Sequence, residues 1–207
     1  SERSRGLGDV YKRQDWHPKL LKAYFTRNTQ GALRSFDYDI HKSAWADVAR
    51  SANEHNDPGH FTTFIGYEYT TSTDIEGGNL HRNVIFNSSK ASIRPWTRID
   101  SINPEDLWTW QDKLREKGVD TISMPHNPNG SNGQMFEMET FKGNAIDREY
   151  SEKRMRNEPI VEITQVKGTS DTHPLLSPDD EWADFEIMDV RVGSRPPTYL
   201  SLIHISE

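Results

Sequence analysis

A short apolar run at residues 119–124 constrains the fold of this chain more than any other stretch. Gly118 precedes the run and Pro125 follows it, and a proline has no N–H to donate to a strand ladder. The pattern predicts a buried strand that emerges from a helix and ends at Pro125. His126 comes next, before a loop of Asn, Pro, Gly and Ser that runs to Gly133. An imidazole at a strand end, opening into a polar loop, is where α/β proteins place chemistry.

Two earlier segments also combine a predicted strand with a candidate ligand. Residues 60–69 are rich in Phe, Thr, Ile and Tyr, which favour strands, and they carry Glu68. Residues 79–87 form the next predicted strand and carry His81. An unpaired carboxylate that closes an apolar strand would be costly to bury, so Glu68 needs a partner. We therefore single out Glu68, His81 and His126 as the candidate functional set.

The chemistry of this set favours a metal. Two imidazoles and a carboxylate suit Zn, Mn or Fe, and the absence of cysteine leaves histidine and carboxylate as the ligands for any such site. Taken singly, each histidine is more often structural than a ligand, and Glu68 could instead pair with Arg82 or Lys167. Arg82 follows His81 directly and points to the opposite side of a regular strand, where we expect a structural ion pair.

Predicted helices alternate with the predicted strands along the rest of the chain. The helix signals are Ser43 before residues 44–52, Asn103-Pro104 before a helix that Gly118 stops, the charged residues 147–157, and Ser177-Pro178 before Trp182 and Phe185. We expect Trp108 and Trp110 to lie in the core. The alternation predicts an α/β fold, barrel-like or layered. Its strands would share one mostly parallel sheet: residues 60–69, 79–87, 119–125 and 159–165.

Composition excludes several classes of protein. The net charge of -7 disfavours nucleic acid as a partner. Hydrophobic residues make up only 33% of the chain, but six Trp, seven Tyr and eight Phe favour a folded domain with large polar loops over a disordered chain. No apolar run approaches the length of a membrane span, and no signal peptide is visible.

Both ends of the chain have unusual sequences. Residues 1–14 show no hydrophobic period, and both they and residues 195–207 resemble translated sequencing-adaptor read-through seen in metagenomic assemblies. The alternative is ordinary disordered termini. On the first interpretation residues 15–194 are the domain, the parent protein extends beyond both ends, and its compartment is not predicted because the native N-terminus lies upstream.

Several blocks of sequence resemble one bacterial family. They are residues 61–68 (FTTFIGYE), 78–86 (GNLHRNVIF), 104–108 (PEDLW), 125–127 (PHN) and 158–168 (EPIVEITQVKG). Together they resemble the bacterial domain-of-unknown-function family 3604, which looks related to the PHP (polymerase and histidinol phosphatase) metallohydrolases. That resemblance implies a distorted β/α barrel with a cluster of metals at its C-terminal face, here incomplete at both ends.

The resemblance also implies roles for the candidate set. Glu68 matches the carboxylate that bridges two metals, and His81 and His126 match imidazoles that complete one of those sites; Glu68 and His126 would be the catalytic residues. The superfamily's His-x-His and Asp-x-His motifs are missing from their expected positions. Asp171-Thr172-His173 has the second spelling but follows the 159–165 strand too closely, so we do not expect it to bind metal.

The polar loops supply candidate substrate contacts. Asn127, Asn129 and Lys167 could bind phosphate or sugar oxygens of a small molecule, although such loops are often only solvated turns. The first hypothesis is a metal-dependent, phosphoesterase-like hydrolase. The second is a catalytically inactive partial barrel that binds one metal or none. The third is a carbohydrate- or peptide-binding module that uses exposed aromatic side chains, which burial of all six Trp would contradict.

Overall fold

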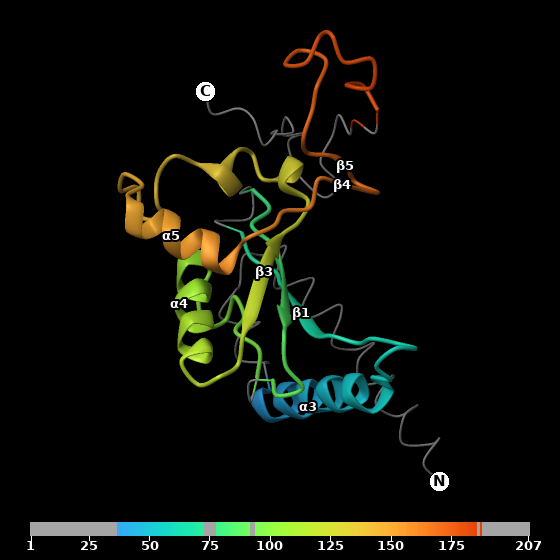
Figure 1. The fold of residues 1–207 in the computed structure, drawn as a ribbon. Coiled ribbons are helices and arrows are strands. Elements are labelled where there is room, and N and C mark those ends of the chain that lie inside the picture. The colour runs from blue at the N-terminus through green and yellow to red at the C-terminus, as the bar shows by residue number, and fades with distance from the viewer. Residues whose placement is uncertain (1–36, 73–77, 92–93, 186, 188–207) are drawn as a thin grey trace. The chain divides into compact units, whose positions relative to one another are not determined.

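The computed structural model describes residues 37–72, 78–91, 94–185 and 187. The chain divides into two compact units, Ser1–His41 and Lys42–Glu207, and the described elements belong to the second, apart from the first residues of α3. The predicted terminal segments, residues 1–14 and 195–207, lie outside the described residues. The elements, labelled in Figure 1 where there is room, are α3 (Tyr38–His55), β1 (Ile65–Tyr69), β2 (Arg82–Phe86), α4 (Pro104–Arg115), β3 (Thr121–Pro125), the 3-10 turns η1 (Pro128–Gly130) and η2 (Gln134–Phe136), α5 (Arg148–Asn157), β4 (Thr164–Gln165) and β5 (Gly168–Thr169).

Three of the predicted strands form one sheet in the order β1-β2-β3, but the sheet is antiparallel at both junctions. The prediction of a mostly parallel sheet is therefore wrong. A parallel neighbour needs a crossover connection, usually a helix, and residues 70–81 between β1 and β2 are mostly polar and glycine, with no helical pattern of apolar residues. The fold has mixed helix and sheet content, and its described strands close no barrel.

The fourth predicted strand, residues 159–165, is not part of this sheet. Only Thr164–Gln165 is extended and paired, and it pairs with Gly168–Thr169 in a separate two-stranded hairpin. The segment does reach β3 at one point, where the Glu162 N–H donates to the carbonyl of Pro125 at 3.0 Å.

Helix starts follow capping chemistry. The Asn103 side chain accepts from the N–H of Glu105, and Pro104 occupies the first helical position, so the predicted start of α4 is confirmed. Asp147 caps α5 in the same way through the N–H of Tyr150. Gly118 has a φ of +76° after the last turn of α4, which is the conformation that glycine tolerates best.

Two helix predictions were wrong. The helix expected after Ser43 begins earlier, because the Asp37 carboxylate accepts from the N–H groups of Asp39 and Ile40 and so caps it. The helix expected after Ser177 is a series of turns. Its apolar residues Trp182 and Phe185 are 66% and 59% exposed, and a short helix without an apolar surface to pack on is marginal in water.

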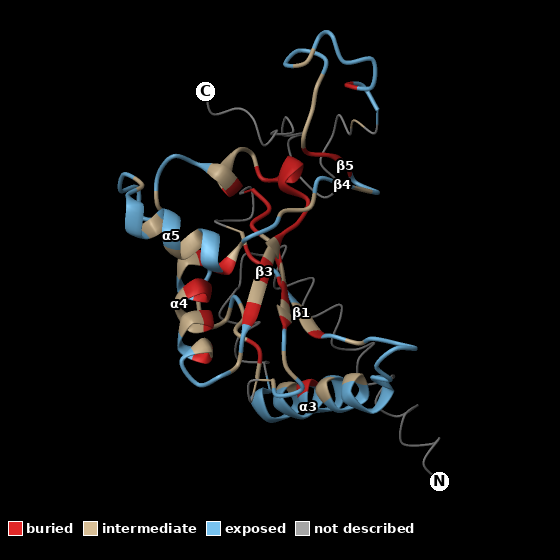
Figure 2. Cartoon of the chain, viewed as in Figure 1, coloured by how far each residue is buried: buried red, intermediate tan, exposed pale blue. Residues whose placement is uncertain are grey.

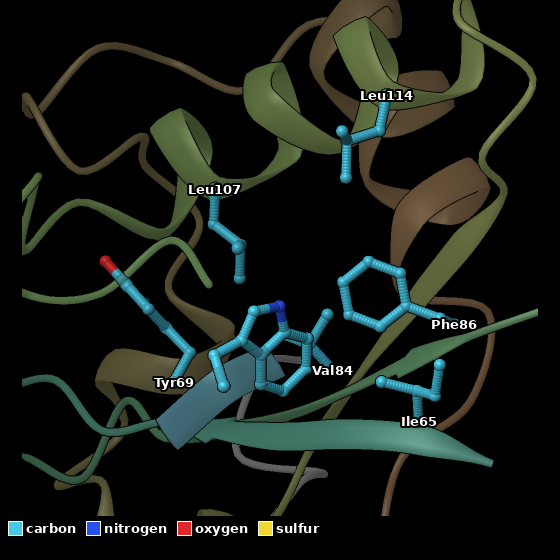
Figure 3. Packing of buried hydrophobic residues seen from close by; sticks show 7 residues of the cluster. Ile65, Tyr69, Val84, Phe86, Leu107 and Leu114 are labelled. Atoms are coloured by element: carbon cyan, nitrogen blue, oxygen red, sulfur yellow. The ribbon is translucent and has the colours of Figure 1, made fainter. Parts of the chain in front are cut away.

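The core lies between the sheet and its helices. Alternate residues of β1 and β2 point to one face, where Ile65, Tyr69, Val84 and Phe86 meet Leu107 and Leu114 of α4, as Figure 3 shows, and Trp45 of α3 completes the cluster. Figure 2 shows that buried residues also continue into the loop after β3. Trp108 is fully buried and Trp110 packs on the cluster, so both predictions are confirmed. None of the described helices is long and apolar enough to cross a bilayer.

Candidate metal centre

The antiparallel register brings the three candidate ligands to one end of the sheet. Arg82, the first residue of β2, pairs with Pro125, the last residue of β3. His81 and His126 are the next residues outward, and the His126 N–H donates to the His81 carbonyl at 3.3 Å. Glu68 is the penultimate residue of β1, the other neighbour of β2. The start of β2 therefore lies beside the ends of both β1 and β3.

The three side chains converge at this end. His81 Nδ1 lies 2.9 Å from Glu68 Oε1, and His126 Nε2 lies 3.8 Å from the same oxygen. The two imidazole rings are 5.8 Å apart at 65°. One ligand atom from each residue lies within 4.8 Å of the others. Among the described residues, this is the one group of histidines and carboxylates that could hold a metal ion.

The electrostatics of the site favour neutral imidazoles. Burial lowers the pKa of His81 to about 4, although the Glu68 carboxylate acts in the opposite direction. Burial also lowers the pKa of His126, where Glu68 and Glu162 oppose the shift and Lys167 and Arg82 reinforce it. Both rings are thus neutral at pH 7, which is the form that binds metals.

The donor set fits a divalent metal. The imidazole nitrogens lie 2.9 and 3.8 Å from Glu68 Oε1, separations that Zn–N and Zn–O bonds of about 2.0–2.2 Å can span. His126 Nδ1 is buried and has no hydrogen-bond partner among the described residues. The other ring nitrogen, Nε2, faces Glu68 Oε1 and is the candidate ligand atom. Glu68, His81 and His126 form a group that could hold a divalent metal ion.

The Asn79 side chain and a close backbone approach at Gly78 hold the start of β2 against the loop after β3. Asn79 accepts from the His81 N–H through its side-chain oxygen at 2.9 Å and donates its amide to the Asn127 carbonyl at 3.2 Å. Gly78 lies so close to Ser131 that a Cβ would be 1.6 Å from the Ser131 carbonyl oxygen, so only glycine fits there. These contacts fix His81 relative to His126.

A second carboxylate stands close to the site and was not among the candidates. Glu162 Oε2 accepts from the Asn127 N–H and from the Gln165 side-chain amide, both at 2.8 Å. Its charge raises the pKa of His126 against the larger effect of burial. The sequence signal was available, because Glu162 follows an apolar stretch much as Glu68 does.

The three predicted substrate residues have different surroundings. Lys167 is exposed, in the turn between β4 and β5. Asn127 and Asn129 are buried, and the Asn129 amide donates to the Lys167 carbonyl at 2.9 Å. The side-chain oxygens of both asparagines lack hydrogen-bond partners among the described residues. Substrate contact by all three stays a prediction.

The residues that were not expected to bind metal, Asp171, His173 and Arg82, lie outside the candidate metal group. His173 Nδ1 accepts from the Leu175 N–H, and Asp171 accepts from the Thr169 hydroxyl; neither belongs to the metal group. Arg82 makes the expected structural ion pair, with Glu158 at 2.6 Å, on the core side of the sheet. Glu68 pairs with His81, and not with Arg82 or Lys167 as the structural alternative proposed.

The lowered pKa of His81 predicts acid sensitivity in the metal-free protein. The unfolded chain takes up a proton on this residue near pH 6.5, whereas the folded chain does so only near pH 4. Stability should therefore fall as the pH decreases through that window. Urea unfolding at a series of pH values, with a chelator present, measures the loss. His81→Gln should reduce the loss, and His173→Gln should leave it unchanged; equal pH profiles for wild type and His81→Gln would contradict the assignment.

Comparison with known proteins identifies the family. The family model described as "Protein of unknown function (DUF3604)" matches residues 8–201, most of the chain. No curated protein and no solved structure matches the sequence. The five sequence blocks that resemble this family all fall inside the matched region, and they include Glu68, His81 and His126. The chain belongs to the DUF3604 family.

Proposed function

We propose that the chain carries the metal centre of a metal-dependent, phosphoesterase-like hydrolase. One observation carries the proposal: Glu68, His81 and His126, at the ends of three neighbouring strands, place one ligand atom each within 4.8 Å of the others. Two neutral imidazoles and a carboxylate are a common ligand set for hydrolytic metals, with a coordination position left for water or substrate.

The imidazoles and the carboxylate would have different roles in the site. When bound, a divalent metal polarises a phosphoryl oxygen and lowers the pKa of water. The imidazoles of His81 and His126 would hold it in their neutral forms. Glu68 is oriented by the Thr70 hydroxyl, which donates to its Oε1 at 2.9 Å. The same carboxylate, half-exposed, would bind the metal and contact the reacting groups together with His126.

A relation to the PHP metallohydrolases is part of the same proposal. Its support is the ligand chemistry and the order Glu, His, His along the chain. The partial β/α barrel that this relation implies also stays a proposal, because the described strands form an open antiparallel sheet. An experimental structure with metal bound would decide both points.

The proposed substrate is a small phosphorylated molecule. The Lys167 ammonium, which makes no ion pair among the described residues, supports an anionic group near the imidazoles. The net charge of -7 makes an extended polyanion such as nucleic acid an unfavourable partner.

The proposal is tested by metal titration followed by a hydrolysis assay. We expect one Zn²⁺ or Mn²⁺ per chain by calorimetry, because the described residues hold one three-ligand group. Turnover of bis(p-nitrophenyl) phosphate should be slow, metal-dependent and lost in Glu68→Ala. Asp57→Ala, which removes an exposed carboxylate outside the site, is the matched control. Turnover that persists in Glu68→Ala would contradict the assignment, and metal binding without turnover would favour an inactive metal-binding module.

One observation favours the binding-module alternative. Trp182 is 66% exposed and packs edge-to-face with Phe185 at 6.3 Å, which is the kind of aromatic surface that stacks on sugar rings. Changes in tryptophan fluorescence on adding oligosaccharides, absent in Trp182→Ala, would support this second function.

A further inference from the structure

We propose that Asn129 is a positioning residue that holds the β4–β5 turn, and with it Lys167, beside the candidate metal centre, where the Lys167 ammonium would bind the anionic group of a ligand. The role of the anion rests on the proposed function. The restraint of the turn by Asn129 does not require a metal. It assigns Asn129 a role different from direct substrate contact.

Lys167 is presented by a very short hairpin. Gln165 pairs with Gly168, so the turn between β4 and β5 consists of Val166 and Lys167 alone. Gly168 has a φ of +106°, which permits so tight a turn. Both turn residues are exposed, and Val166 is 92% exposed, so packing of their side chains does not hold the turn in place.

Asn129 supplies the missing restraint. It lies in η1, three residues after His126, and is only 1% exposed. Its side-chain amide donates to the Lys167 carbonyl at 2.9 Å, and its backbone N–H donates to the Ser170 hydroxyl at 3.0 Å. One residue of the site loop thus holds the turn and the strand that follows it.

The base of the hairpin is tied to the same loop independently. Glu162 accepts from the N–H of Asn127 and from the side chain of Gln165, and the Ser170 N–H donates to the Ile163 carbonyl at 2.8 Å. With its base fixed there, the remaining freedom of the hairpin is at its tip, where Asn129 acts.

The positive charge of Lys167 affects both imidazoles of the site. Burial is the main cause of the lowered pKa of both His81 and His126, and the positive charge of Lys167 lowers each of them further. Asn129 lies three residues after His126 and donates to the Lys167 carbonyl, so the turn that carries this ammonium adjoins the loop of the site. An anion that approached the metal ligands would meet it there.

The first test is metal-free. Lys-C cleavage after Lys167, followed by mass spectrometry, reports how often the turn opens. Loss of one hydrogen bond in Asn129→Ala should raise the cleavage rate there by about two- to tenfold, with cleavage after Lys117 as the internal reference. Asn144→Ala, an exposed asparagine in another loop, is the control. Ser170→Ala, which removes the other acceptor, should act in the same direction if Asn129→Ala folds poorly. An unchanged rate at Lys167 in both variants would overturn the proposal.

The second test separates positioning from contact. Calorimetry measures inorganic phosphate binding to the Zn²⁺-loaded protein. Lys167→Met should weaken it by about two- to fivefold, the value of an exposed ion pair, and Asn129→Ala should do the same. In the Lys167→Met background, which retains the backbone carbonyl, Asn129→Ala should have no further effect. An undiminished effect in that background would overturn the positioning role. If zinc does not bind at all, the proposed function fails, and Lys-C cleavage alone decides whether Asn129 restrains the hairpin.

Discussion

Replacing Glu158 with alanine should lower the free energy of unfolding by about 3–5 kcal/mol, the cost of leaving a buried charge without its partner. The Glu158 side chain is 1% exposed and accepts from Arg82 at 2.6 Å, Trp108 at 2.8 Å and Arg154 at 3.2 Å. Its removal leaves the Arg82 guanidinium, which is 3% exposed on the core side of β2, without its ion-pair partner. Urea unfolding followed by circular dichroism measures the change.

The matched control is Glu152→Ala, in the helix that ends just before Glu158. Glu152 pairs with Arg148 at 2.7 Å within α5, but the two side chains are 58% and 91% exposed. An exposed pair of this kind contributes about 0–1 kcal/mol, so its removal should be nearly neutral. Similar losses for Glu158→Ala and Glu152→Ala would show that burial does not set the strength of the Arg82–Glu158 contact.

Replacing His126 with alanine should weaken Zn²⁺ binding by more than about a hundredfold, because ligand loss exceeds the 10–100-fold cost of changing a residue that only supports a ligand. Calorimetric titration of the metal-free protein gives the affinity, and circular dichroism checks that the variant is folded. The wild type should bind at most one metal tightly, because the described residues hold one three-ligand group.

His173→Ala is the corresponding control. His173 lies in the Asp171-Thr172-His173 sequence, and its Nδ1 already accepts from the Leu175 N–H at 3.1 Å. We expect the Zn²⁺ affinity of this variant to equal that of the wild type. Loss of the metal in His173→Ala would mean that the Asp-x-His sequence belongs to the site after all.

Local chemistry made several features predictable from the sequence. Asn103 and Pro104 determined the start of α4, since a side-chain cap and a fixed φ act within a few residues. Pro125 determined the end of β3, because it cannot donate to a ladder. The choice of Glu68, His81 and His126 likewise needed only the position of each residue beside a predicted strand.

Tertiary structure decided how these residues meet. In a parallel sheet His81, at the start of its strand, would lie at the opposite edge from Glu68 and His126, and the three could not share a metal. The antiparallel register of β2 brings them together. The role of Asn129 and the position of Glu162 also depend on contacts between distant segments, which local sequence patterns do not encode.

Side-chain chemistry and short-range sterics were enough to predict three of the four strands, the cap of α4 and the identity of the candidate ligands. The sequence by itself did not determine strand direction, the fate of residues 159–165, or the absence of a helix after Ser177. These three features depend on tertiary packing, because they are set by the surfaces against which each segment packs. The candidate metal centre depends on both, since local chemistry supplied its donors and long-range strand pairing set their distances.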